Sequence, residues 1–446
     1  MTQEKKKGNI VAIIMMIFLF GMISFVTNLS SPMGDVLKNR FTVPNWVGTL
    51  GVFANFIAYA VMGIPAGIML QKRGYKKTAL TAIAIGFVGV GIQTLSGTID
   101  SSIAVAVYLL GAFVAGFSMC LLNTVVNPML NNLGGGGNRG NQLIQIGGSF
   151  NSLCGTAVIV IVGVLVGDIA KANISDVFPV MYIALVIFAL AFVAIALATI
   201  PESQQKHETG KQEKSQYSPL SFRHFILGAA GIFVYVGVEV GIPNILQKFL
   251  QNVDLNVLQL TGKPETIGEQ AATIAGFVAG TYWFLMLIGR LAGAAIASKV
   301  SAKNMLIAVS VIGLFFVLGA IIAGKGNLVD LPTLQKSAEG QLSFGLVKVP
   351  LSAALLVLCG LCTSVMWGGI FNLAVEGLGK YTEKASGIFM VLVCGGGILP
   401  LLQNAIVDMT DGVGYLTSYW VIVAGLIYLL YYALVGSKNV NKNIPV

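Results

Sequence analysis

Long apolar runs recur along this chain of 446 residues, and they constrain its fold more than any other feature. A helix needs about 20 mostly apolar residues to cross roughly 30 Å of hydrocarbon, and about twelve runs meet this criterion. We therefore predict an all-α polytopic membrane protein with twelve transmembrane helices. The expected spans are residues 9–33, 46–70, 78–97, 103–130, 141–166, 177–199, 223–250, 270–297, 304–323, 350–375, 385–408 and 414–436.

The composition supports this class. Only 10% of the residues are charged and 56% are hydrophobic, whereas soluble proteins carry about 25% charged residues. The basic N-terminus, MTQEKKKGNI, precedes an apolar run that has no small-residue cleavage site, so we expect a retained first helix. All five cysteines fall in apolar runs, far in sequence from both histidines. We interpret them as buried apolar side chains and expect neither a metal nor a cofactor.

The basic residues predict the topology. With a cytoplasmic N-terminus, 18 of the 27 Lys and Arg residues fall on the cytoplasmic side and eight on the other, while Arg290 lies inside a run. This positive-inside bias places both termini in the cytoplasm and the chain in the cell inner (plasma) membrane. The net charge of +9 follows from this topology. We therefore expect membrane lipids and a small-molecule substrate as partners, and no nucleic acid.

The chain reads as two duplicated halves. Residues 201–222 form a polar stretch typical of a cytoplasmic linker, with six apolar runs before it and six after. AGIMLQKRGYKK (66–77) is echoed by AGAAIASKVSAK (292–303), and NPMLNNLG (127–134) by NLAVEGLG (372–379). We predict a six-helix half over residues 1–200 and another over residues 223–446.

Polar residues in the first half recur at helical spacing. Asn123 and Asn127 are four residues apart and share a helix face, and Pro128 follows. A buried amide without partners costs roughly 2–7 kcal/mol, so such groups favour a wet cavity. Hydrogen bonds between helices are the alternative interpretation. Three other sets of polar residues share a helix face in the same way: Ser24, Asn28 and Ser31; Asn55 and Tyr59; and Gln145, Ser149 and Ser152.

The second half presents aromatic and charged residues instead. Tyr235 and Glu239 share a face of one span, and Trp367 lies in the middle of another. Sugars offer hydroxyls to amides and carboxylates, and C–H faces to aromatic rings. The pattern therefore suits a neutral monosaccharide. Glu239 is the clearest acid deep within a span, which makes it a candidate for proton coupling, while an ion pair with Arg290 is the structural alternative.

Several segments resemble the major facilitator superfamily, and more narrowly the fucose:proton symporter family with its glucose/galactose branch. They are PAGIMLQKRGYKK, NTVVNP and FNSLCG in the first half, and YVGVEVGI, YWFLMLIGRLAG and IFNLAVEGLGKYTEKASG in the second. The resemblance implies the major facilitator fold, alternating access about a midplane site and proton-coupled sugar uptake.

This chain departs from the family pattern at three places. Ser30 and Ser31 stand where the family's first span carries an N-D pair, and Asn123 replaces the acid of E-T-x-x-N-P. Gly148 stands where a Gln usually precedes the position of Asn151 by three residues. Because two acid positions are neutral, proton coupling does not carry over directly from the resemblance.

We therefore predict a secondary active transporter, not an enzyme, that moves a hexose, deoxyhexose or N-acetylhexosamine and couples to protons through Glu239. A uniporter or a carrier coupled to another cation is the first alternative, and an intramembrane lipid- or glycan-modifying enzyme is the second. The candidate substrate-binding residues are Asn28, Ser31, Asn55, Tyr59, Asn123, Asn127, Gln145, Asn151, Tyr235, Glu239, Tyr282, Trp283, Trp367 and Asn372.

Overall fold

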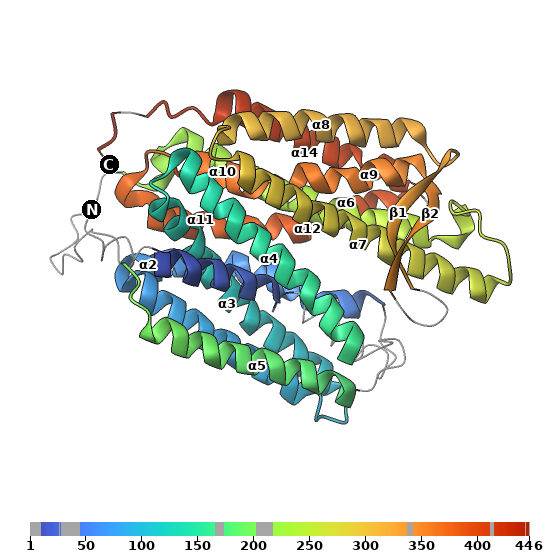
Figure 1. Cartoon of the computed structure of the whole chain (residues 1–446), viewed down its shortest axis with the longest axis horizontal. Helices are drawn as coiled ribbons and strands as arrows, with labels where there is room; N and C mark the ends of the chain where they lie inside the picture. The colour runs from blue at the N-terminus through green and yellow to red at the C-terminus, as the bar shows by residue number, and fades with distance from the viewer. Residues whose placement is uncertain are drawn as a thin grey trace. The chain divides into compact units, whose positions relative to one another are not determined.

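The computed structural model describes residues 10–25, 27, 45–165, 174–201, 217–336, 342–410, 414–441 and 443–445. Most of these residues are helical, as Figure 1 shows. Nine helices among them are long and apolar enough to cross a membrane. The expected helical membrane class is confirmed, and the arrangement is consistent with twelve spans. A shorter apolar helix, Ile10–Phe25, corresponds to the first expected span.

Two expected spans merge into one element, α2 (Asn45–Ser96). The helical geometry of α2 is interrupted at Gly74, whose φ of 78° is readily adopted only by glycine. The basic segment QKRGYKK surrounds this glycine, so the interruption marks where the spans 46–70 and 78–97 meet. The helices that follow are α3 (Ile103–Leu133), α4 (Gly137–Leu165), α5 (Ile174–Leu197) and the short η1 (Pro219–Ser221).

The later spans are more often broken into pieces. The long helices are α6 (Arg223–Gln251), α7 (Pro264–Ile296) and α8 (Ala302–Ala323). One expected span divides into α9 (Leu351–Thr363) and α10 (Met366–Val375), and the next into α11 (Thr382–Val391), η4 (Leu392–Cys394) and α12 (Gly395–Asp408). The last comprises α13 (Tyr415–Ser418), α14 (Trp420–Tyr431) and η5 (Tyr432–Gly436), and the short turns are η2 (Val253–Leu255) and η3 (Gly379–Tyr381).

The chain packs as two compact units. The first unit comprises Met1–Ala229, Phe371–Cys394 and Asn439–Val446, and the second comprises Ala230–Ile370 and Gly395–Lys438. Part of α10 and all of α11 therefore pack with helices from the first half of the sequence. Residues 202–216 of the expected linker lie outside the described residues, and the duplicated halves stay a prediction.

Within the first unit, α2 and α11 approach each other closely at glycines. A Cβ atom on Gly387 would lie 2.5 Å from the carbonyl oxygen of Gly63 and 2.5 Å from the Cα atom of Gly67. Any larger side chain at Gly387 would force these backbones apart. Small residues allow such contacts between membrane helices, where dispersion and close packing supply most of the association energy.

The second unit contains a β-hairpin that the apolar runs do not predict. Strand β1 (Leu328–Lys336) pairs antiparallel with β2 (Leu342–Pro350), with Leu328 opposite Pro350. The hairpin joins α8 to α9 and lies beside α7 (Figure 1). It is an addition to an otherwise helical fold.

Candidate functional site

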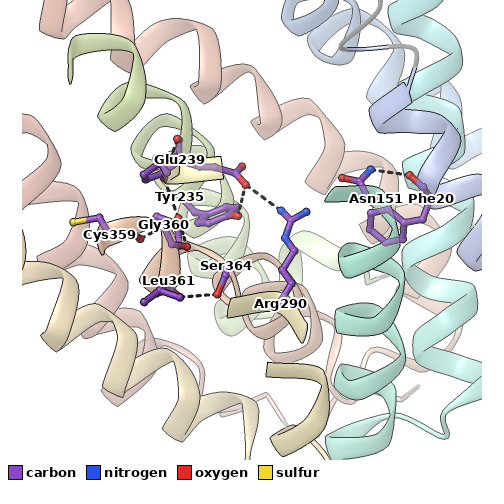
Figure 2. Close-up of polar contacts among 11 residues, drawn as sticks. Phe20, Asn151, Tyr235, Glu239, Arg290, Cys359, Gly360, Leu361 and Ser364 are labelled. Atoms are coloured by element: carbon purple, nitrogen blue, oxygen red, sulfur yellow. Dashed lines mark hydrogen bonds and ion pairs between the residues drawn. The ribbon is translucent and has the colours of Figure 1, made fainter. Parts of the chain in front are cut away.

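The strongest polar cluster of the second unit centres on Glu239 of α6. The hydroxyl of Tyr235, one helical turn earlier, donates to Glu239 Oε1 at 2.8 Å. Arg290 of α7 donates to the same oxygen from 3.2 Å, and the Arg290 and Glu239 side chains are only 10% and 13% exposed. Figure 2 shows both contacts converging on the carboxylate. The ion pair that the sequence left as an alternative is therefore present.

A proline positions a further member of this cluster, which we name the Glu239 cluster: Tyr235, Glu239, Tyr282, Arg290, Thr363 and Trp367. Pro243 has no N–H, so it leaves the carbonyl oxygen of Glu239 without its helical donor. The hydroxyl of Tyr282 on α7 donates to that oxygen at 3.1 Å. The same hydroxyl lies 2.9 Å from Thr363 Oγ1 of α9. The cluster thus ties three helices together at a fully buried tyrosine.

Trp367 adds an aromatic wall to the Glu239 cluster. Its ring centroid lies 6.3 Å from that of Tyr235, with the two planes at 58°. Trp367 is the second residue of α10. It follows the break at residues 364–365 between α9 and α10, and its side chain is half-buried. A half-buried ring next to Tyr235, which itself bonds the Glu239 carboxylate, can pack on the C–H face of a sugar whose hydroxyls bond polar groups nearby.

The first unit holds a separate set of amides. Asn123 donates from Nδ2 to the hydroxyl of Tyr59 at 2.7 Å, and Asn127 Nδ2 donates to the Asn123 carbonyl oxygen at 2.9 Å. Asn55 is only 5% exposed, and neither its Nδ2 nor its Oδ1 has a hydrogen-bond partner among the described residues. Since a buried amide is costly when unpaired, Asn55 has hydrogen-bonding capacity left for a bound molecule or water.

The α4 candidates lie on the same helix but differ in exposure. Asn151 Nδ2 donates to the carbonyl oxygen of Phe20 at 2.7 Å, a contact also drawn in Figure 2. Gln145 is buried, and its carbonyl oxygen accepts a hydrogen bond from Ser149. Asn28 and Ser31, the candidates of the first span, lie outside the described residues.

Two further candidates have different surroundings. Trp283 is 37% exposed on the surface of α7, with its ring edge-on to Tyr282. Asn372 belongs to the first unit, where its Nδ2 donates to Asn131 Oδ1 at 2.9 Å and to the Gly137 carbonyl oxygen at 3.1 Å. It borders a cavity of about 480 Å³ formed with the glycine-rich turn 135–137 and Thr382.

Several residues that no sequence pattern singles out have prominent contacts or burial in the structure. Thr363 is one of many hydroxyl residues in the apolar runs of the sequence. Its contact with the Tyr282 hydroxyl distinguishes it from the others. Ser386 of α11 donates to the carbonyl oxygen of Thr124 on α3 at 3.1 Å. Glu383, at the start of α11, is a second buried acid with 8% exposure. It lies just before the expected span at residues 385–408, so the search for apolar runs does not include it.

Comparison with known families gives a match over most of the chain. The model of the Major Facilitator Superfamily matches residues 11–401. A glucose/galactose transporter of Brucella abortus is 27% identical over 94% of this chain and 93% of its own length. A putative glucose/galactose transporter of Helicobacter pylori is 28% identical over 98% and 99%. The L-fucose-proton symporter of Escherichia coli is 21% identical over 92% and 90%.

Solved structures share the fold. A major facilitator superfamily transporter, FucP, in the outward conformation, superposes with a TM-score of 0.77 at 19% identity, covering 97% of this chain and all of the other. The proton:xylose symporter XylE bound to 6-bromo-6-deoxy-D-glucose gives a TM-score of 0.71 at 12% identity, over 97% and 98%. At these identities the likeness concerns the fold alone.

Proposed function

The chain belongs to the major facilitator superfamily of transporters, and we propose that it carries a neutral monosaccharide across the inner membrane by alternating access. Relatives named as glucose/galactose transporters, matched over nearly their whole length, support a hexose as the substrate. A deoxyhexose is the nearest alternative, because two further relatives are named as L-fucose-proton symporters. Alternating access follows from the way transporters of this superfamily are built.

The observation that carries this proposal is the Glu239 cluster. It combines a charge pair that can bind hydroxyls with the ring of Trp367, inside a unit made of apolar helices. A neutral sugar can accept a hydrogen bond from Arg290, donate one to Glu239 and place a C–H face on the tryptophan. We propose Tyr235, Glu239, Tyr282, Trp283 and Trp367 as the sugar-binding residues of the second unit.

Several amide side chains of the first unit are also candidates for binding the sugar. The buried amide of Asn55 has no partner within the part of the chain that the structure describes, and Tyr59, Asn123 and Asn127 form one continuous chain of hydrogen bonds. We propose these four with Gln145, Asn151 and Asn372 as further binding candidates. Asn28 and Ser31 stay predictions from the sequence.

Glu239 is the proposed proton carrier. A proton that joins its carboxylate removes the negative charge with which Arg290 pairs at 3.2 Å. Arg290 can then turn to another acceptor, so the Glu239 carboxylate and the substrate compete for the same guanidinium and protonation of Glu239 favours substrate binding. Uniport is the alternative. If the ion pair with Arg290 keeps the Glu239 carboxylate ionised throughout the transport cycle, Glu239 cannot carry a proton.

The experiment uses the whole protein in proteoliposomes with a panel of labelled monosaccharides. Uptake of glucose or galactose that unlabelled sugar inhibits is the expected result, and uptake of no sugar in the panel would reject the proposal. An imposed inward proton gradient should then drive accumulation above equilibrium. Equilibration without accumulation would assign the protein as a uniporter or a carrier coupled to another cation. The proposed orientation has both termini in the cytoplasm.

A further inference from the structure

The β1–β2 hairpin has one covered face and one open face. On the covered face, Thr333 and Val349 are completely buried and Leu331 is 8% exposed. On the open face, Phe344 is 69% and Leu346 66% exposed. This is the alternation that a two-stranded sheet shows when only one side packs on protein. The open face therefore exposes two large apolar side chains beside the exposed pair Asp330 and Lys348, and the surroundings of these apolar side chains need an explanation.

The covered face is fixed to one side of α7. Thr333 Oγ1 donates to the carbonyl oxygen of Phe277 at 3.2 Å and accepts from Thr281 Oγ1 at 2.9 Å. From the open face, the ring of Phe344 also reaches α7, where its centroid lies 6.2 Å from that of Phe284, about one turn after Thr281. The hairpin therefore follows a defined face of this helix.

That face of α7 is the one turned toward lipid. Phe284, Ile288 and Leu291 recur at i, i+4 and i+7 and are 37%, 40% and 56% exposed. In an apolar span, an exposed apolar stripe of this kind faces hydrocarbon. Arg290 and Tyr282 lie on the opposite side of the helix, with the Glu239 cluster. The open face of the hairpin thus continues the lipid-facing surface of α7 through the contact between Phe284 and Phe344.

The backbone limits how deep the hairpin lies. Each strand of an antiparallel pair turns some of its N–H and C=O groups away from its partner, and hydrocarbon offers them nothing. Open strand edges are consequently restricted to a depth that water or headgroups reach. The charges agree, because Asp330 and Lys348 are exposed and lie opposite each other in register, at the end of the hairpin nearer α8 and α9.

We propose that the β1–β2 hairpin is an interfacial lipid-binding element, with Phe344 and Leu346 in the acyl-chain boundary and Lys348 among the phosphate headgroups. In the proposed orientation this is the outer leaflet. Aromatic and aliphatic residues below a lysine form the usual sequence of groups across such an interface. This inference depends on the fold and on the membrane, and it holds whichever sugar is carried.

The test measures the surroundings of single residues. Nitroxide labels are placed at Phe344→Cys and Leu346→Cys in a cysteine-free background, and the protein is reconstituted in phosphatidylcholine/phosphatidylglycerol bilayers. Collisions with oxygen, which concentrates in lipid, are compared with collisions with a water-soluble nickel chelate. Phe315→Cys, 72% exposed within the apolar helix α8, is the lipid reference, and Lys325→Cys, exposed in the turn after α8, is the water reference.

At both hairpin sites we expect an oxygen-to-nickel ratio clearly above that of Lys325→Cys and below that of Phe315→Cys, because the acyl-chain boundary is shallower than the middle of α8. A ratio equal to that of Lys325→Cys would overturn the proposal and place the hairpin in water. Dipolar broadening between labels on separate molecules would also overturn it, because the open face would then be a contact between two copies. All four substitutions are at exposed positions, and thermal unfolding checks that each variant is folded.

Discussion

Ser386 Oγ donates a hydrogen bond to the carbonyl oxygen of Thr124 at 3.1 Å, and this is the carbonyl that Pro128 leaves without a helical donor. A helix N–H bonds the carbonyl four residues earlier, and proline has no N–H. The free oxygen on α3 is therefore bonded by a hydroxyl from α11. Within the first unit this joins segments that are about 260 residues apart in the sequence.

The second unit contains the same device. Pro243 frees the carbonyl oxygen of Glu239, and the Tyr282 hydroxyl from α7 donates to it at 3.1 Å. In a membrane an unpaired backbone oxygen is costly. At each of these two prolines, a hydroxyl from a neighbouring helix supplies the missing hydrogen-bond donor. The prolines in these two spans thus help to fix which helices pair.

Replacing Ser386 with Ala tests this pairing. The Thr124 oxygen loses its donor, and we expect the free energy of unfolding to fall by about 0.5–2 kcal/mol. Pro128→Ala restores an N–H at position 128, so in that background Ser386→Ala should cost little. Thermal unfolding of the two single variants and the double variant, in one detergent, gives the coupling. Equal costs of Ser386→Ala in both backgrounds would contradict the explanation.

The spans could be predicted from the sequence because hydrocarbon imposes length and apolarity on every helix. The described helices follow the expected ranges closely, as in α9 and α10, which together cover 351–375 against an expected 350–375. The hairpin at 328–350 could not be predicted in this way. Its strands are short, mixed in polarity and set outside any span, so they leave no signal in a window of about 19 residues.

The candidate site could be predicted only within a helix. Helical spacing correctly placed Tyr235 next to Glu239, and Asn127 next to Asn123. Spacing gives no information about which helices meet, so it could not show that Asn372 bonds Asn131 in the first unit. The role of Tyr282 depends on a carbonyl freed by a proline 39 residues earlier in the chain, which is a tertiary relationship.

The close approach of α2 and α11 predicts intolerance at Gly387. A Cβ there would lie 2.5 Å from the Gly63 oxygen, so Gly387→Ala should cost about 1–3 kcal/mol through overpacking. Gly91→Ala is the matched control, because a Cβ on Gly91 has no atom within 4 Å. Melting temperatures of both variants are compared with that of the parent. A fall for Gly91→Ala as large as that for Gly387→Ala would refute the contact.

The topology predicts the accessibility of two basic turns. Lys77 and Lys299 are both exposed. They lie in the two similar segments 66–77 and 292–303, each of which begins with Ala-Gly. Cysteines at these positions should resist an impermeant thiol reagent in intact cells and react after the cells are opened. Lys325→Cys, expected on the other side, should react in intact cells. Labelling of position 77 or 299 from outside would reverse the proposed orientation.

Sugar binding is expected to need both Asn127 and Trp367. Asn127→Ala removes an amide from the hydrogen-bonded chain with Asn123, and Trp367→Ala removes the ring beside Tyr235. Each change should weaken binding by more than about tenfold, or about 1.4 kcal/mol. Trp420→Ala, which replaces a 54% exposed ring, should leave the dissociation constant unchanged. Parental affinity in either site variant, measured on folded protein, would remove that residue from the site.

Coupling is expected to depend on the charge of Glu239. Glu239→Gln keeps the shape and an oxygen that can accept from Tyr235, but it cannot take up and release a proton or form the ion pair with Arg290. In proteoliposomes with an inward proton gradient, this variant should lose accumulation of sugar and keep exchange of sugar down its gradient. Glu376→Gln, a change at an exposed acid of the first unit, should keep both activities. Since Glu383 is also buried, Glu383→Gln is measured beside them. Proton-driven accumulation that survives in Glu239→Gln and disappears in Glu383→Gln would transfer the coupling role to α11.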